Sequence, residues 1–171
     1  MKQLLLMIAV VMLVGCGKKE DGNTGAVKPN LPSPEAVPEK LITDPNVEKA
    51  IREKLEKPEG ELTEADYEQL EELSLFNNKL TEVPKGLENL TQLKWLHLYS
   101  NQLTDVKGLE KFTKLKSLHL QDNQLTSVKG LEKLTQLTYL NLEHNPDLTK
   151  AQIDELQKAL PKCKISSNPT K

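Results

Sequence analysis

The sequence is poor in aromatic residues and cysteine, and its charges nearly balance. Of its 171 residues, one is Trp, three are Tyr, two are Phe and two are Cys, and the formal net charge is −2. This balance argues against a nucleic-acid partner, which requires a basic patch. The motifs H-E-x-x-H, G-x-S-x-G and C-x-x-C are absent, so we expect no metal site, no cofactor and no enzyme activity.

Long hydrophobic runs are also missing, with one exception near the amino terminus. The apolar run Leu4–Val14 has 11 residues, fewer than the ~20 that a membrane-spanning helix needs. Together with the positive charge of Lys2, this length is typical of the hydrophobic segment of an export signal. We therefore predict that residues 1–15 are a signal peptide.

Leucine, in contrast, recurs at a fixed period. The pattern L-x-x-L-x-L-x-x-N-x-L begins at Leu70, Leu93 and Leu115, and at Leu137 with its last leucine one residue later, at intervals of 23, 22 and 22 residues. Such self-similarity is the signature of stacked repeats. One central copy is formed by Leu93, Leu96, Leu98, Asn101, Leu103, Val106, Leu109 and Phe112.

Each L-x-L segment is predicted to be a short strand with its leucines in the core and its central residue facing out. Successive strands then pair in parallel, and the leucines of one copy are covered by the next copy. The recurring Asn lies where the chain leaves the strand, so its amide can bond backbone groups that no strand reaches. We interpret four residues as structural for this reason: Asn78, Asn101, Asn123 and Asn145.

This repeat resembles the leucine-rich repeat, and its 22-residue period is similar to the bacterial class found in internalins. The resemblance implies an α/β solenoid with a short parallel β-sheet on its concave face and 3₁₀ or short turns on its convex face. It also implies a protein- or ligand-binding module. Gly86, Gly108 and Gly130 each precede a core leucine, and we interpret them as residues that set the backbone conformation.

The tetrapeptide Leu13-Val14-Gly15-Cys16 resembles the lipobox of bacterial lipoproteins. That resemblance implies cleavage before Cys16 and attachment of lipid, including palmitate, to Cys16, which excludes an intramolecular disulfide. By analogy with Gram-negative families, Gly17 in place of Asp favours the outer membrane. The alternative is a plain secretory signal with an incidental cysteine.

Three further segments follow the signal peptide. Residues 16–40 contain the lipidated cysteine and a tether that is rich in charge, Gly and Pro and cannot form a core. Residues 41–69 are predicted to be a helical cap, with Asp44 and Thr63 as helix N-caps; an independent interaction helix is the alternative. Residues 70–171 contain the repeats and a closing repeat.

The closing repeat is predicted from the spacing of Leu160, Cys163, Ile165 and Asn168. A helix over 149–159, with Thr149 and Gln152 in a capping-box pattern, leads into a last strand at about 162–165. Cys163 is then expected at an inward leucine position, buried and unreactive. A nucleophile or an intermolecular bridge is the alternative.

The outward positions of the strands gather most of the aromatic side chains and all three His. Exposed aromatic residues are favoured anchors of interfaces, although strands also favour them simply because they cover a pleated surface. The predicted binding patch consists of Phe76, Trp95, His97, Tyr99, His119 and Tyr139. His97 and His119, with Asp122 and Glu143 nearby, form a much weaker candidate for a metal or hydrolase site.

The expected protein is thus a monomeric, lipid-anchored module of the bacterial cell envelope, and the analogy given above favours the outer membrane. Five short strands expose a few hundred Å² in projection, whereas a standard complex buries ~800 Å² per partner. The concave face therefore suits a peptide, the edge of a glycan or a weak protein contact. A structural spacer without a defined ligand is the alternative.

Overall fold

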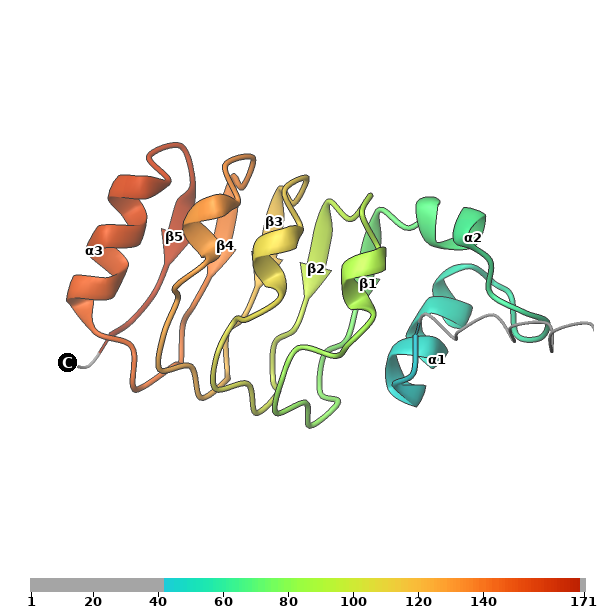
Figure 1. The fold of residues 1–171 in the computed structure, drawn as a ribbon. Helices are drawn as coiled ribbons and strands as arrows, with labels where there is room; N and C mark the ends of the chain where they lie inside the picture. Colours follow the sequence, from blue (N-terminus) through green and yellow to red (C-terminus); the bar gives the residue numbers. More distant parts are fainter. Residues whose placement is uncertain (1–41, 170–171) are drawn as a thin grey trace, which may run out of the picture. The chain divides into compact units, whose positions relative to one another are not determined.

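The computed structural model describes residues 42–169, which lie in one compact unit (Figure 1). The predicted signal peptide, Cys16 and the tether lie outside the described residues. Among the helices formed by residues 42–169, none combines the length and the apolar character needed to cross a membrane.

The repeats form one parallel sheet of five three-residue strands, in the order β1-β2-β3-β4-β5 (Figure 1). The strands are β1 (Glu72–Ser74), β2 (Trp95–His97), β3 (Ser117–His119), β4 (Tyr139–Asn141) and β5 (Lys164–Ser166). Each of the first four strands has its central leucine buried between two more exposed residues. The predicted leucine-rich solenoid and its sheet are therefore confirmed.

Short 3₁₀ helices form the side of the solenoid opposite the sheet, as predicted. They are η1 (Leu87–Asn89), η2 (Leu109–Lys111) and η3 (Leu131–Lys133). Each begins after a glycine in the left-handed region, with φ of 87° at Gly86, 98° at Gly108 and 107° at Gly130. Glycine adopts this conformation without steric cost, which confirms the interpretation of these residues.

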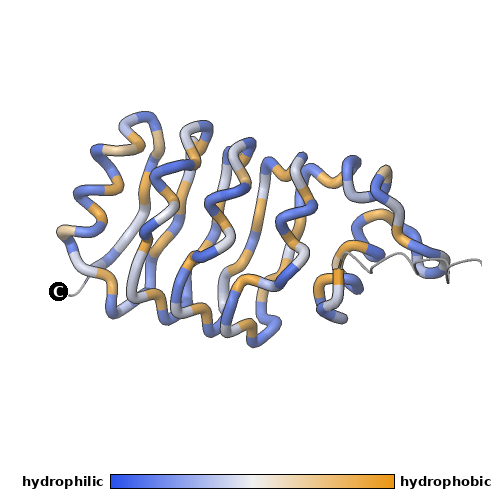
Figure 2. Tube along the Cα trace, in the orientation of Figure 1, coloured by the Kyte–Doolittle hydropathy of each residue, from blue (hydrophilic) through white to orange (hydrophobic). Residues whose placement is uncertain are grey.

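The core is a column of leucines that runs through all coils. Hydrophobic segments recur at matching places in successive coils (Figure 2). The repeat leucines are almost completely buried; Leu96, Leu98, Leu118 and Leu120, for example, are each 0% exposed. Because one coil is too thin to bury its own leucines, each coil is stabilised by its neighbours.

Asn101 joins two coils through its side-chain amide. Its Nδ2 donates to the carbonyl oxygens of Leu98 in its own coil (3.0 Å) and Leu75 in the preceding coil (2.9 Å). Its Oδ1 accepts from the backbone N–H groups of Asn78 (2.9 Å) and Leu80 (3.1 Å). One buried side chain thus satisfies backbone groups that the short strands leave unpaired.

Asn123 and Asn145 repeat this arrangement. Each donates to a strand-end carbonyl of its own coil and of the preceding coil, and each accepts from a preceding-coil N–H, that of Leu103 or Leu125, at 3.0 Å. We call Asn101, Asn123 and Asn145 the asparagine ladder. Asn78, in the first coil, is only partly buried and its side chain donates to the Phe76 carbonyl within its own turn (3.1 Å).

Two helices form the amino-terminal end of the described chain. In α1 (Pro45–Lys54), the Asp44 side chain caps the first turn, and Val47 and Ile51 are buried. In α2 (Glu64–Glu68), Thr63 forms a capping box with Asp66. Both predicted N-caps are confirmed. Contacts between α1 and β1 place the first helix against the first strand.

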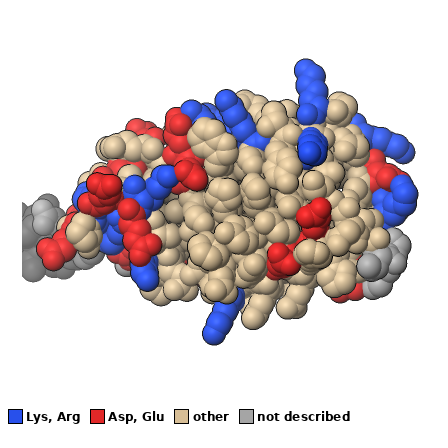
Figure 3. Space-filling model, turned by 180° about the vertical axis from the view of Figure 1, so that it is seen from behind, with Lys and Arg blue, Asp and Glu red and all other residues tan. Residues whose placement is uncertain are grey.

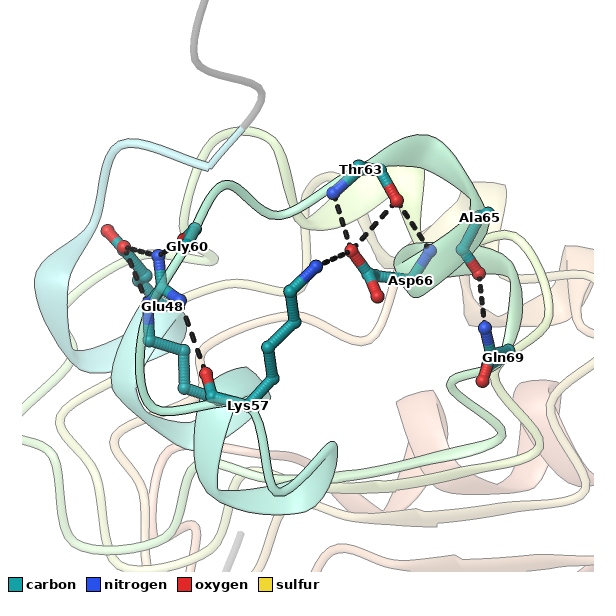
Figure 4. Close-up of polar contacts among 8 residues, drawn as sticks. Glu48, Lys57, Gly60, Thr63, Ala65, Asp66 and Gln69 are labelled. Atoms are coloured by element: carbon teal, nitrogen blue, oxygen red, sulfur yellow. Dashed lines mark hydrogen bonds and ion pairs between the residues drawn. The ribbon is translucent and has the colours of Figure 1, made fainter. Parts of the chain in front are cut away.

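Polar contacts connect these helices and the loop between them (Figure 4). Arg52 bonds Glu48 at 2.9 Å and donates to the carbonyl oxygens of Lys57 (3.2 Å) and Gly60 (2.9 Å). Lys57 donates to Asp66 at 2.7 Å. This bond, followed by those from Thr63, lowers the pKa of Asp66 to about 2.

The carboxyl-terminal helix is confirmed, but the strand after it differs from the prediction. Helix α3 (Lys150–Ala159) begins with the expected capping box of Thr149 and Gln152. The last strand is β5, Lys164–Ser166, rather than 162–165. Its register pairs Lys164 with Tyr139 and Ile165 with Leu140.

The predicted position of Cys163 in the repeat is therefore wrong, whereas its predicted burial is confirmed. Ile165, not Cys163, pairs with Leu140, because the ten-residue α3 replaces a three-residue 3₁₀ helix and lengthens this coil. Cys163 is still only 4% exposed, and burial raises the pKa of its thiol to about 11. Its low reactivity stays a prediction that this environment favours.

The asparagine ladder makes a testable contribution to stability. Asn123→Ala leaves the N–H of Leu103 without its side-chain partner and removes one of the two amide donors of the Leu98 and Leu120 carbonyl oxygens, which keep Asn101 and Asn145. We expect the free energy of unfolding to fall by roughly 2–4 kcal/mol, since the unpaired buried N–H costs ~1–3 kcal/mol and each hydrogen bond lost at the two carbonyls costs ~0.5–1.5 kcal/mol. Urea unfolding measures it. The exposed Asn89→Ala serves as control, and equal stability of the two variants would contradict the role of the ladder.

Candidate functional site

The strands place the predicted patch on one side of the sheet. Beside each buried central leucine of β1–β4, the flanking residues point outward, as does the second residue after each strand; the residue directly after the strand is another buried leucine. We call this surface, formed by 72–77, 95–100, 117–122 and 139–144 without the buried leucines, the sheet face. All six predicted patch residues lie on it: Phe76, Trp95, His97, Tyr99, His119 and Tyr139.

Five of these six side chains form a continuous chain of rings. Phe76 stacks on Tyr99 with ring centroids 5.2 Å apart and planes 14° from parallel. Tyr99 meets His97 edge-on at 6.4 Å. His97 lies 4.7 Å from His119, which in turn lies 5.3 Å from Tyr139. We call these five residues the ring chain.

The register of the sheet explains the ring chain. His97 pairs directly with His119, and Ser117 with Tyr139. Parallel strands lie about 4.8 Å apart, which is close to the spacing at which aromatic rings stack favourably. Because the coils share one geometry, ring side chains at outward positions of neighbouring coils come into contact.

Trp95 lies beside the ring chain rather than in it. Within the described residues it forms none of the ring contacts above, and it pairs with Glu72 and Ser117 across the sheet. Trp95 is 39% exposed and Phe76 50% exposed, and they are the large hydrophobic side chains that the described chain leaves exposed. The other four patch residues are half-buried, because the rings partly cover one another.

The sheet face is weakly charged at its centre. Figure 3 shows the molecule from the side opposite to Figure 1, and its middle consists mainly of uncharged side chains, with Lys and Arg mostly toward the edges. The ranges 72–77, 95–100, 117–122 and 139–144 contain no Lys or Arg. Their acidic residues are Glu72, Asp122 and Glu143.

The two histidines of the ring chain differ in their electrostatic surroundings. His97 Nε2 lies 3.6 Å from Glu72, which also accepts a 2.6 Å bond from Lys54 of α1. That bond from Lys54 is the main cause of the lowered pKa of Glu72. Burial, followed by the nearby charge of His97, lowers the pKa of His119 below its ordinary value of 6.5.

Sequence reasoning missed the contribution of α1 to this face. The outward position of Glu72 follows from the repeat, but no pattern in the sequence places Lys54 beside it. The weaker metal candidate is not assembled as a site: His144, not His97 or His119, bonds Asp122 (2.9 Å). Over the described residues 42–169, no three side chains among His, Cys, Asp and Glu gather in a way that could hold a metal ion.

These features define a solenoid of short strands and 3₁₀ turns with one ring-lined face. The chain belongs to the leucine-rich repeat family: the model described as "Leucine Rich repeats (2 copies)" matches residues 68–111, 91–128 and 113–158. No curated protein matches the sequence. Domains of this family are typically protein–protein interaction modules, and the matches indicate no enzymatic family.

Solved structures similar to this chain include bacterial leucine-rich repeat proteins. Internalin C2 from Listeria monocytogenes is 26% identical, with a TM-score of 0.64 over 77% of this chain and 58% of its own. The functional domain of InlJ from the same organism is 27% identical, with a TM-score of 0.61 over 76% and 28%. A leucine-rich repeat protein from Leptospira interrogans is 34% identical, with a TM-score of 0.54 over 62% and 28%.

The ring chain predicts a pH effect centred on His119. Because its pKa is lowered in the fold, the unfolded chain binds the proton first, so the free energy of unfolding should decrease as the pH falls from about 6.5. Tyr139→Ala opens His119 to water and should raise its pKa toward the ordinary value. An NMR titration of the His119 ring measures this shift. The exposed Gln136→Ala is the control; a His119 pKa unmoved by Tyr139→Ala would contradict the assignment to burial.

Proposed function

We propose that this chain is a lipid-anchored protein of the bacterial envelope that binds a protein or peptide partner through its sheet face. The single observation that supports binding most strongly is the gathering of the ring chain and Trp95 on one surface. Membership of a family of interaction modules supports the same proposal.

Exposed aromatic side chains are the physical reason to expect a partner. Large apolar side chains left in water are unfavourable, and a contiguous group of them is typical of an interaction site. Trp and Tyr are also frequent energetic centres of protein interfaces. In this chain the leucine core does not need them, since it is closed without any side chain of the sheet face.

The proposed lipid anchor is supported by the sequence. The lipobox-like Leu13-Val14-Gly15-Cys16 supports a lipid on Cys16, and residues 17–40 supply the composition of a tether. If the residues are extended at ~3.1 Å each, the tether reaches at most ~75 Å from the lipid. Such an arrangement would hold the sheet face clear of the membrane, and Gly17 favours the outer membrane.

Partner capture from envelope extract tests the binding half of the proposal. Trp95→Ala/Tyr99→Ala removes the exposed indole and the centre of the ring chain, and we expect it to lose the partner that wild type retains. The control variant Lys107→Ala/Lys129→Ala changes exposed side chains on the turns before η2 and η3 and should retain it. Thermal unfolding verifies that both variants are folded. An identical set of captured proteins for all three chains would favour a structural spacer instead.

Membrane fractionation tests the anchor. Wild type should sediment with the membranes and incorporate labelled palmitate, because acyl chains at Cys16 add ~0.8 kcal/mol of membrane affinity per buried methylene. Cys16→Ser should remain in the soluble fraction without label, whereas Cys163→Ser should behave as wild type. Labelling that persists in Cys16→Ser would show that the cysteine is incidental.

A further inference from the structure

One row of the sheet face changes in character from aromatic to acidic. It consists of the second residue after each of strands β1–β4, namely Phe76, Tyr99, Gln121 and Glu143. Backbone bonds from Asn77 to Tyr99 (3.2 Å), from Ser100 to Gln121 (3.0 Å) and from Asp122 to Glu143 (3.0 Å) hold these strand ends side by side. We call these four residues the strand-end row.

The aromatic half of the row offers a ring face. Phe76 and Tyr99 are nearly parallel at 5.2 Å, so the Tyr99 face away from Phe76 is turned toward the next strand end, where Gln121 lies. A planar cation stacks well on such a ring. The row thus presents a π surface immediately beside an amide.

The other half of the row carries side-chain oxygens that have few partners among the described residues. Gln121 Oε1 is buried and has no hydrogen-bond partner among the described residues, a situation that is unfavourable for a polar atom. The Glu143 carboxylate accepts a long bond from Asn141 Nδ2 (3.5 Å), while the Glu143 backbone N–H donates to Asn141 Oδ1 (2.9 Å). The carboxylate has no cationic partner within the described chain. Glu72 and Asp122, in contrast, are paired with Lys54 and His144.

The charge of the surrounding surface has the same sign. The four ranges of the sheet face contain three carboxylates and no Lys or Arg, although the chain has 23 of these basic residues. Glu143 is the carboxylate without a cationic or histidine partner among the described residues, and the exposed Lys164 lies beyond it on β5, next to Tyr139. An acidic partner segment would be repelled here, and a basic one attracted. A glycan would stack on the rings but would not explain why the four ranges contain no Lys or Arg.

We propose that the sheet face binds a basic segment of its protein partner, with one arginine of that segment lying along the strand-end row. The inference rests on the proposed function and specifies the partner's chemistry. The guanidinium stacks on Tyr99 and bonds the carboxylate of Glu143. Arginine fits this row because its planar fork can stack on a ring and bond oxygens in its plane simultaneously.

Selection from a random dodecapeptide phage library tests this inference. Peptides bound by the full chain and lost with Trp95→Ala/Tyr99→Ala are sequenced, and we expect Arg to be enriched over the input library. The best peptide is then synthesised with Arg and with citrulline, its neutral isostere. Glu143→Gln should weaken the Arg peptide about tenfold and the citrulline peptide little, as expected for a charge-assisted contact.

The control variant Glu155→Gln removes an exposed carboxylate from α3 and should bind both peptides as wild type does. The arginine contact would be contradicted if the peptides that depend on Trp95 and Tyr99 were not enriched in Arg or were enriched only in Lys. It would also be contradicted if the Arg peptide bound Glu143→Gln as tightly as wild type. Either result would leave the proposed function standing. If no selected peptide depends on Trp95 and Tyr99, or if only oligosaccharides bind the face on a glycan array, both proposals fall.

Discussion

The hydrogen bonds of the asparagine ladder are the constraint on which the rest of the structure depends. Three-residue strands pair only a few backbone groups, and a coil of about 22 residues cannot bury its own leucines. Asn101, Asn123 and Asn145 bond the strand ends of two coils simultaneously and are almost fully buried. Each therefore fixes the position of one coil relative to the preceding one, so that leucine packs on leucine along the whole solenoid.

The same constraint produces the candidate site. Once coils are locked in register, residues at equivalent outward positions lie one strand spacing apart, and His97 contacts His119 for the same reason that Leu96 pairs with Leu118. The leucine core contains none of the ring-chain residues, so the side chains at these outward positions are free to serve recognition. The ends of the solenoid add what the repeats lack: α1 brings Lys54 to Glu72, and α3 leads into the closing strand.

A feature of this structure could be predicted from the sequence where the interactions that produce it repeat from coil to coil. The repeat predicts the strands, the left-handed Gly108, the buried Asn123 and the face that carries Trp95, because each depends only on position within a coil. The register of β5 was not predictable from the leucine spacing, since a helix of different length precedes it. The Lys54–Glu72 pair and the lowered pKa of His119 depend on tertiary packing that a one-dimensional pattern does not contain.

Residue-resolved amide hydrogen exchange tests the central claim most directly. If the ladder locks the coils, the N–H groups of Leu80, Leu103 and Leu125, which bond the Asn oxygens, should exchange as slowly as those of Leu75, Leu98 and Leu120 in the sheet, through global unfolding. Exchange of the ladder amides at the rate of exposed turns, while the sheet amides remain protected, would contradict it.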